Sequence, residues 1–288
     1  MIRIHFSGRM RPDMSRHPRR ATAQETVAIL GRGDYTAPSG RTVSIAGDLA
    51  RAVEETVLYR PDELDALLER SPAGAGAETR IEVTGETTLA AARRLCGGGT
   101  IPFALNFASA KNPGGGFLNG AHAQEEGLAR SSGLYTSLRS AQEFYDFHRA
   151  QGDLLYSDHM IYSPGVPVFR DDAGRLLDDP YGVAFLTSPA PNRGAIRDPA
   201  RAERIPAVLR RRARKVLAVA LANGHARLVL GAWGCGVFRN DPAEVAEAFA
   251  EPLRPGGEFA GRFEHVVFAV WDTAKGCPRQ AAFEEAFA

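Results

Sequence analysis

Three consecutive glycines and a later pair of glutamates are the residues of this chain best suited to chemistry. Residues 114–116 read Gly-Gly-Gly, and after seven further residues the chain continues with Gln-Glu-Glu at 124–126. Glycines leave the backbone amides without side chains, so a bulky ligand can approach them closely. Where such a tract leads into a helix, the unpaired amides and the helix dipole favour an anion. An anion-binding backbone beside carboxylates predicts an enzyme that acts on a phosphorylated ligand.

The two adjacent glutamates, Glu125 and Glu126, admit a structural and a catalytic interpretation. Acidic residues commonly occupy the first turn of a helix, because they stabilise its positive end. The preceding glycines favour the catalytic interpretation. Neighbouring helical residues project about 100° apart, so the two carboxylates cannot flank one bond as the pair does in ordinary glycosidases. We therefore expect one glutamate to transfer a proton and the other to hold a sugar hydroxyl.

A second glycine-rich segment, residues 231–241, reads Gly-Ala-Trp-Gly-Cys-Gly-Val-Phe-Arg-Asn-Asp. A strand-to-helix turn alone could require Gly234 and Gly236, because glycine tolerates positive φ. Phe238 is harder to assign to a core, since it follows the glycines and precedes a polar run, and we predict that it stacks on a sugar. Cys235 has no histidine or acidic residue placed to activate a thiolate, so we interpret it as a small loop residue.

The spacing of the three glycines and the Gln-Glu-Glu resembles the signature of poly(ADP-ribose) glycohydrolases. Residues 105–109 and 128–135 are similar to the compact bacterial branch of that family, and residues 231–241 resemble its diphosphate-binding loop. The resemblance covers roughly residues 78–288. It implies a macrodomain, which is an α/β/α sandwich with a mixed central sheet. It also implies that Glu126 is the catalytic acid/base and that Glu125 binds the distal ribose.

One position departs from the macrodomain pattern. Many macrodomains carry Asn-Ala-Ala-Asn before the glycine loop, and the second Asn holds the distal ribose. Here residues 106–109 read Asn-Phe-Ala-Ser, so that second Asn is absent. We expect Ser109 or Asn112 to take its place.

Two segments are candidates for binding the adenine. Residues 83–88 resemble the strand-to-helix turn where macrodomains hold adenine, although Glu86 and Thr88 also fit a plain helix start. Trp271, at the end of the last expected strand, could stack on a base or be buried in the core. The complete set of predicted ligand-binding residues is Gly114, Gly115, Gly116, Gln124, Asn106, Ser109, Asn112, Gly234, Cys235, Gly236, Val237, Phe238, Glu86, Thr88 and Trp271.

The resemblance implies hydrolysis of the ribose–ribose O-glycosidic bond of poly(ADP-ribose), mainly from the chain end, with release of ADP-ribose. The expected partners are poly(ADP-ribose) and ADP-ribosylated proteins. The alternative is a non-catalytic ADP-ribose-binding macrodomain, a reader, because this fold hosts binders as well as enzymes. A reader does not need a carboxylate pair after its glycines, so Glu125 and Glu126 favour the enzyme. The same pair disfavours hydrolysis of mono-ADP-ribosyl esters.

The overall composition argues against several other classes. The formal charge of +1 gives no general DNA- or RNA-binding surface, which would need a markedly basic domain. No apolar run is long enough to span a membrane. The three cysteines are widely separated and the seven histidines lack metal-ligand spacing, so we expect no disulfide framework, metal or cofactor. A cytoplasmic location fits this composition best.

The chain is expected to divide into an N-terminal, mainly helical extension, residues 1–77, and a catalytic domain, residues 78–288. In the extension we expect helices at 21–30, 48–57 and 61–70, a hairpin at 35–45 and a linker at 71–77. In the catalytic domain we expect strands at 81–83, 101–107, 227–230 and 265–270, and helices at 88–95, 205–223 and 242–249. This alternation predicts an α/β sandwich with its ligand at the carboxyl ends of the strands.

Overall fold

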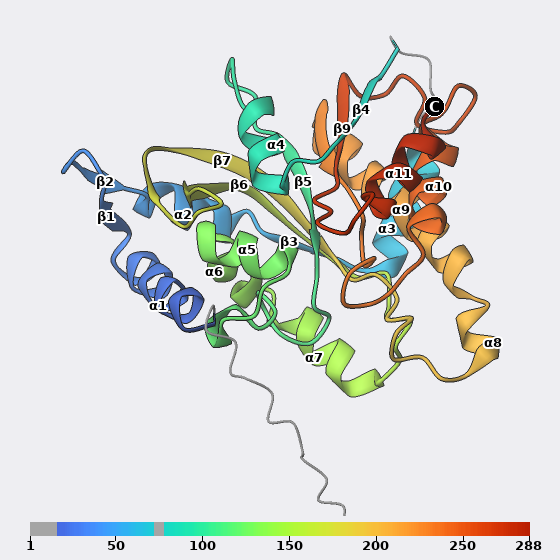
Figure 1. Cartoon of the computed structure of the whole chain (residues 1–288), viewed down its shortest axis with the longest axis horizontal. Coiled ribbons are helices and arrows are strands. Elements are labelled where there is room, and N and C mark those ends of the chain that lie inside the picture. The colour runs from blue at the N-terminus through green and yellow to red at the C-terminus, as the bar shows by residue number, and fades with distance from the viewer. Residues whose placement is uncertain (1–15, 72–77) are drawn as a thin grey trace, which may run out of the picture.

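A mixed seven-stranded sheet forms the centre of the computed structural model, which describes residues 16–71 and 78–288 (Figure 1). The strand order across the sheet is β3-β6-β7-β5-β8-β9-β4. The strands from β7 to β4 are parallel to their neighbours, whereas β6 runs antiparallel to both β7 and β3. Their bounds are Val57–Tyr59 (β3), Arg80–Thr84 (β4), Phe103–Phe107 (β5), Met160–Arg170 (β6), Leu176–Ser188 (β7), Arg227–Leu230 (β8) and His265–Ala269 (β9).

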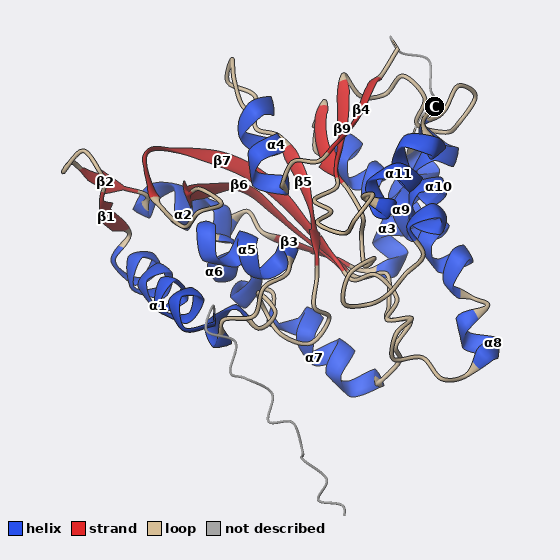
Figure 2. Ribbon diagram, viewed as in Figure 1, coloured by secondary structure: helices blue, strands red, loops and turns tan. Residues whose placement is uncertain are grey.

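Helices cover both faces of this sheet (Figure 2). Strand residues alternate between the two faces: in β5, Phe103 and Leu105 pack into one hydrophobic cluster and Ala104 into the other. The first cluster is covered by α3 (Pro61–Arg70), α9 (Ile205–Ala222), α10 (Pro242–Leu253) and α11 (Pro278–Ala286). The second is covered by α2 (Ala46–Glu54), α4 (Thr88–Leu95), α5 (Gln124–Ser131), α6 (Leu134–Ser140) and α7 (Gln142–Gln151). The expected macrodomain-like α/β/α sandwich is confirmed.

The N-terminal extension begins with α1 (Arg16–Arg32) and a hairpin of β1 (Asp34–Thr36) and β2 (Thr42–Ser44). The hairpin spans residues 34–44, one residue earlier at its start than the expected segment 35–45. The expected helix at 21–30 is longer at both ends, because α1 runs from Arg16 to Arg32 and is followed by Gly33, whose φ of +79° requires glycine. Except for Ser71, the expected linker at 71–77 lies outside the described residues, and the division into domains at residue 77 stays a prediction.

One expected helix ends earlier than the sequence pattern indicates. The segment 48–57 forms α2 only as far as Glu54, and Val57 begins strand β3. The reason lies far away in the sequence: residues Val57 to Tyr59 pair with β6, where Val57 lies opposite Tyr162. The extension therefore contributes an edge strand to the central sheet. The short helices α8 (Pro199–Ala202) and η1 (Phe117–Asn119) complete the described elements.

The parallel strands β4, β5, β7, β8 and β9 all end at the same edge of the sheet. The loops that follow them contain every residue of the predicted site outside helices and strands. Ligands of open α/β sheets bind at this edge. Within the described parts of the chain, no helix combines the length and apolar character needed to cross a membrane.

Candidate active site

The glycine tract after β5 lies directly against the two glutamates. Gly114 and Gly115 have φ of +68° and +60°, a conformation that glycine adopts readily and other residues rarely. A Cβ added to Gly115 would collide with Glu126 Oε1 and would lie 3.1 Å from Glu125 Oε2. The glycine therefore makes room for both carboxylates, which come together at one point of the backbone.

Glu126 is half-buried near the start of α5 and faces the glycine tract. The amide of Gly116 donates a hydrogen bond of 2.9 Å to Glu126 Oε1. This bond ties one carboxylate oxygen to the backbone. The carboxylate thus sits at the lip of the glycine loop, where a group can exchange a proton with a ligand held by that loop.

Glu125 lies deeper, with only 3% of its surface exposed. Its Oε2 accepts a hydrogen bond of 2.7 Å from the amide of Ser109, and its Oε1 accepts one of 3.3 Å from Asn106 Nδ2. The pKa of Glu125 is raised to about 8, because burial and the neighbouring Glu126 carboxylate raise it by more than the hydrogen bonds from Ser109, Asn106 and Gly114 lower it. At neutral pH the two neighbouring carboxyls therefore do not both ionise, and the pair keeps at least one proton.

Gln124, a predicted ligand-binding residue, has its side-chain amide occupied by the protein itself. Its Oε1 accepts from the amide of Phe107 at 2.9 Å. Its Nε2 donates to the carbonyl of Leu105 at 2.8 Å and to Thr88 Oγ1 at 3.1 Å. Gln124 thus fastens the start of α5 to the end of β5 and to α4, and this fixes the position of the two following glutamates.

Asn106, Ser109 and Asn112 shape the floor and turn of the same loop. Asn106 is fully buried and also donates to Thr187 Oγ1 at 3.0 Å, while its own Oδ1 has no hydrogen-bond partner among the described residues. Ser109 Oγ accepts a hydrogen bond of 3.2 Å from the amide of Asn112, and the carbonyl of Asn112 accepts one of 3.0 Å from the amide of Gly115. These bonds fold the chain into the tight turn that presents the glycines.

The second predicted loop follows β8 and is built differently. A Cβ on Gly234, whose φ is +73°, would lie 2.5 Å from both Ala190 Cβ and Asn240 Nδ2, so this glycine is required by the packing of the protein. Around Gly236, by contrast, no atom lies within 4 Å of an added Cβ, and Val237 is 77% exposed. Cys235 is buried, and burial raises the pKa of its thiol to about 12. It therefore stays a neutral thiol.

Phe238 has an aromatic neighbour that sequence analysis missed. The ring of Tyr156 lies 6.0 Å from the ring of Phe238, and Tyr156 adopts a φ of +57°, a strained value for a residue other than glycine. Arg212, with 0% of its surface exposed, holds this segment by donating to the carbonyls of Leu155 and Tyr156 and to Asp158. The local sequence gives no signal for this contact, because the partners lie far apart in the chain.

The adenine candidates lie at the ends of β4 and β9, which are adjacent strands. Trp271 is 63% exposed directly after β9, which excludes the alternative of a buried core residue. Glu86 pairs with Arg94 at 2.8 Å, and the hydrogen bond from Arg94 lowers the pKa of that carboxyl. Thr88 is buried and Thr87 caps helix α4 by accepting from the amide of Ala90. The segment therefore forms the plain helix start that was one of its two interpretations, and its contact with adenine stays a prediction.

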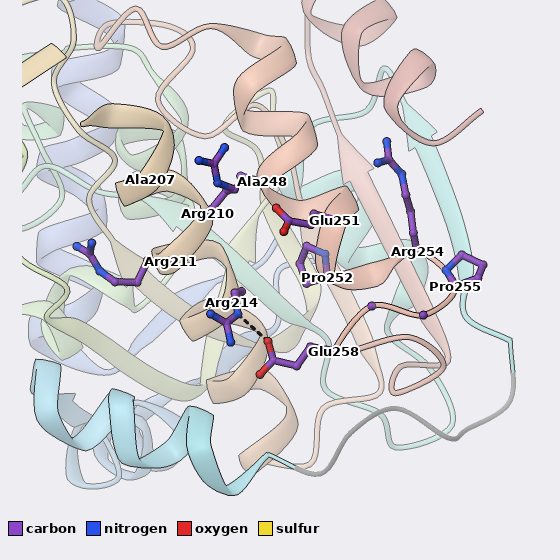
Figure 3. A pocket seen from close by; sticks show the side chains of 12 residues that line it. Ala207, Arg210, Arg211, Arg214, Ala248, Glu251, Pro252, Arg254, Pro255 and Glu258 are labelled. Atoms are coloured by element: carbon purple, nitrogen blue, oxygen red, sulfur yellow. Dashed lines mark hydrogen bonds and ion pairs between the residues drawn. The ribbon is translucent and has the colours of Figure 1, made fainter. Parts of the chain in front are cut away.

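A surface cavity lies away from these loops, between α9, α10 and the segment that follows α10 (Figure 3). It measures about 730 Å³ and contains none of the predicted site residues. Two of its arginines are compensated: Arg214 pairs with Glu258 at 2.6 Å and Arg211 with Asp158 at 2.7 Å. The polar groups of the candidate site converge instead at the glycine loop after β5. No group of three or more potential metal ligands occurs among residues 16–71 and 78–288.

Comparisons with known proteins agree on one family. The profile of "Microbial-type PARG, catalytic domain", where PARG denotes poly(ADP-ribose) glycohydrolase, matches residues 23–171, just over half of the chain. The crystal structure of poly(ADP-ribose) glycohydrolase from Thermomonospora curvata is 70% identical, with a TM-score of 0.92, and the match covers 94% of this chain and 100% of that one. No protein in the curated collection of sequences matches.

Two further structures are complexes. The Thermomonospora curvata enzyme bound to the inhibitor ADP-HPD is 69% identical, with a TM-score of 0.89, and the match covers 93% of this chain and 99% of that chain. Poly(ADP-ribose) glycohydrolase from Deinococcus radiodurans in complex with ADP-ribose is 50% identical, with a TM-score of 0.77, and the match covers 83% of this chain and 96% of that chain.

Proposed function

Because this chain belongs to the microbial-type poly(ADP-ribose) glycohydrolases, we propose that Glu126 is the acid/base that cleaves the ribose–ribose bond. The protein is a glycoside hydrolase that acts on poly(ADP-ribose), and it binds ADP-ribose; the alternative of a non-catalytic reader is set aside. The observation that supports the assignment is the position of Gly115, against which both carboxylates lie.

The proposed reaction needs one proton donor and one water molecule. Protonated Glu126 gives its proton to the departing ribose oxygen while the anomeric carbon takes on oxocarbenium character. The resulting carboxylate then removes a proton from a water molecule that attacks the anomeric carbon, so Glu126 regains its proton and the bond is hydrolysed. The hydrogen bond from Gly116 holds the reacting carboxylate in one orientation during both steps.

Glu125 has the second role, that of orienting the distal ribose. Its two oxygens are fixed by the Ser109 amide and by Asn106, and Oε2 lies against Gly115. A carboxyl that is buried and neutral can donate as well as accept a hydrogen bond, so it can hold a ribose hydroxyl without repelling the nearby Glu126 carboxylate. Ser109 or Asn112, both at the turn, takes the place of the missing macrodomain asparagine.

The rest of the ligand is assigned to the loop after β8 and the neighbouring strand ends. We place the diphosphate on the backbone around Gly236 and Val237, where the surface is open, and a ribose against Phe238. The diphosphate also stabilises the positive charge that develops at the anomeric carbon. The exposed Trp271 and the Glu86–Thr88 turn are assigned to the adenine.

The cleavage pattern, the metal requirement and the cellular location are also proposals. One diphosphate loop beside one carboxylate pair suits a terminal ADP-ribose, so we expect mainly exo cleavage that leaves the last, protein-linked ADP-ribose in place. The substrates are poly(ADP-ribose) and ADP-ribosylated proteins, without general DNA or RNA binding. Both proposed steps use carboxylates alone, and we expect them to need no metal. Cys96, Cys235 and Cys277 are unpaired, which fits the cytoplasm.

The decisive experiment incubates the protein with automodified poly(ADP-ribosyl)ated protein, with and without EDTA, and resolves the released products by length. We expect ADP-ribose as the dominant early product, equal rates with and without EDTA, and one ADP-ribose left on the acceptor. Early accumulation of long free oligomers would contradict exo cleavage. Loss of activity in EDTA, restored by a divalent ion, would contradict the metal-free mechanism.

A further inference from the structure

Tyr156 lies in the segment between α7 and β6, at the same edge of the sheet as the two glycine loops. Because β6 runs antiparallel to β7, its first residues pair with the last residues of β7, as Ile161 does with Thr187. The segment that enters β6 therefore lies at the edge where the parallel strands β7, β5 and β8 end. The ring of Tyr156 lies 6.0 Å from the ring of Phe238, which belongs to the loop after β8.

The backbone of Tyr156 has a conformation that a tyrosine rarely adopts. Its φ is +57°, a value that glycine would adopt without strain. Among the described residues other than glycine, positive φ occurs only at Tyr156, Arg239 and Cys277, and Arg239 directly follows Phe238. Two of the three strained residues thus lie at the Phe238 ring. Strained backbone persists only where the surrounding structure holds it, and it clusters at ligand-binding sites.

A buried arginine of α9 supplies the contacts that hold Tyr156 in this conformation. Arg212 donates to the carbonyl of Tyr156 at 3.2 Å and to that of Leu155 at 3.0 Å. It also donates to the carbonyl of Pro189, directly after β7, at 2.7 Å. Asp158 accepts from the same guanidinium at 2.9 Å, which balances its charge inside the protein. The segment is therefore fixed to the helix and to the end of β7 at once.

The loop that follows β7 joins the Tyr156 segment to Phe238. The amide of Asn192 donates to the carbonyl of Leu154 at 2.8 Å, and the Asn192 side chain is hydrogen-bonded to the hydroxyl of Tyr156. Two residues later, the amide of Gly194 donates to the carbonyl of Phe238 at 2.9 Å. The two aromatic residues therefore belong to one hydrogen-bonded unit, and their rings are held against each other within it.

We propose that Tyr156 is a positioning residue for substrate binding, whose ring holds the Phe238 ring in the orientation in which Phe238 covers a ribose of ADP-ribose. This inference rests on the proposed function, because it takes Phe238 as the contact to the ribose. Both side chains are half-buried, and an aromatic pair at this separation stabilises a defined mutual orientation. A ring that is already oriented loses less conformational entropy when the ligand binds, so the affinity is higher.

The test is a double-mutant cycle between the two rings. Tyr156→Gly removes one ring and suits the positive φ, so the backbone of the segment is kept. Tyr156→Asn, which also tolerates this φ, takes its place if the glycine variant does not fold. Tyr156→Phe is the matched control, because it keeps the ring and loses only the hydroxyl. Phe238→Leu and the double variant complete the cycle. Each protein is measured for the Kd of ADP-ribose by calorimetry and for KM and kcat on poly(ADP-ribose), after a thermal melt has shown that it is folded.

We expect Tyr156→Gly to raise the Kd of ADP-ribose and the KM for polymer by about fivefold each, the size expected from the loss of one aromatic pair. Its kcat should change little, because Glu126 and the loop after β5 are untouched. Tyr156→Phe should bind ADP-ribose as the wild type does, and in the Phe238→Leu background Tyr156→Gly should cause no further loss.

Three results would overturn the proposal: wild-type affinity in Tyr156→Gly, an equal loss of affinity in Tyr156→Phe, or the same loss from Tyr156→Gly whether Phe238 is present or replaced. The last result would show that Tyr156 does not act through Phe238. Failure of the proposed function is distinguishable, because Phe238→Leu alone would then leave the Kd of ADP-ribose unchanged.

Discussion

The loop at residues 114–116 and the loop at residues 234–236 both lie where parallel strands end, yet the space around their glycines differs. Gly115 faces the protein's own carboxylates, and a Cβ there would strike Glu126. Gly236 faces open space, and its neighbour Val237 is exposed. In the same loop as Gly236, Gly234 faces Ala190 and Asn240, so the packing of the protein requires a glycine there.

The comparison indicates three separable reasons for a glycine in these loops. Gly115 makes room for the proposed catalytic carboxylates, Gly234 makes room for the protein's own packing, and Gly236 leaves an open surface where the ligand is proposed to bind. If this is correct, substitutions at Gly115, Gly234 and Gly236 should affect turnover, stability and ligand affinity, respectively. Each of the following predictions tests one part of that separation.

The largest effect is expected for Gly115→Ala. The added methyl group must displace the Glu126 carboxylate, and the φ of +60° strains any residue other than glycine. A displacement of about 1 Å in a catalytic group can lower the rate by about 10²-fold, so kcat on poly(ADP-ribose) should fall at least that far. Steady-state kinetics and a thermal melt on the same sample separate this from unfolding. A variant with normal kcat would show that the glycine does not position the carboxylates.

Gly234→Ala should act on stability. The methyl group would overlap Ala190 and Asn240 at 2.5 Å, and the residue would hold a φ of +73°. Strain of this kind and overpacking together cost about 2–4 kcal/mol. Chemical denaturation should report that loss, while kcat of the folded fraction stays near the wild-type value. A stable variant with weakened ADP-ribose binding would instead place Gly234 in direct contact with the ligand.

The buried carboxyl of Glu125 should make stability depend on pH. Its pKa is raised to about 8 in the folded protein from an ordinary value of 4.5. The folded protein binds the Glu125 proton more tightly than the unfolded chain does. The stability that results from this difference is complete below about pH 4.5 and is lost as the pH rises to about 8. The free energy of unfolding of the wild type should therefore fall by roughly 2 kcal/mol relative to Glu125→Gln between pH 5 and pH 8, below the limit of 1.36 kcal/mol per pH unit. If the free energy of unfolding changed with pH equally in the wild type and in Glu125→Gln, the raised pKa of Glu125 would be refuted.

Gly236→Val should have the smallest effect on the protein and a selective effect on the ligand. The position has room for a side chain, so thermal stability should not change. The added side chain would stand where the diphosphate is proposed to bind, and ADP-ribose affinity should fall by about tenfold, equivalent to about 1.4 kcal/mol. Calorimetry measures this directly. Unchanged affinity for ADP-ribose would show that the diphosphate does not bind at this loop.

The parts of the site that could be predicted from the sequence are those carried by local pattern. Three glycines followed by two glutamates show which side chains meet, because all of them lie within one loop and one helix start. Strand β8 and helices α3 and α4 were predicted with their observed bounds, since capping residues and apolar periodicity are also local.

What the sequence could not show depends on partners distant in the chain. Val57 forms a strand only because β6, about a hundred residues later, pairs with it. The amide of Gln124 suits a ligand equally well, and only the fold shows that Phe107, Leu105 and Thr88 occupy it. No local sequence pattern indicates the long antiparallel pair β6–β7, or the hydrogen bond from Arg212 to the carbonyl of Tyr156.

The most direct test of the account measures polymer hydrolysis and ADP-ribose binding for a single variant, Glu126→Gln. The substitution keeps the shape of the side chain but removes the proton that it must donate. We predict that kcat on poly(ADP-ribose) falls by about 10²- to 10⁴-fold, the usual size of an acid–base contribution. The Kd of ADP-ribose should stay at the wild-type value, because the diphosphate is bound elsewhere. Near-normal hydrolysis of the polymer by Glu126→Gln would contradict the assignment of Glu126 as the acid/base.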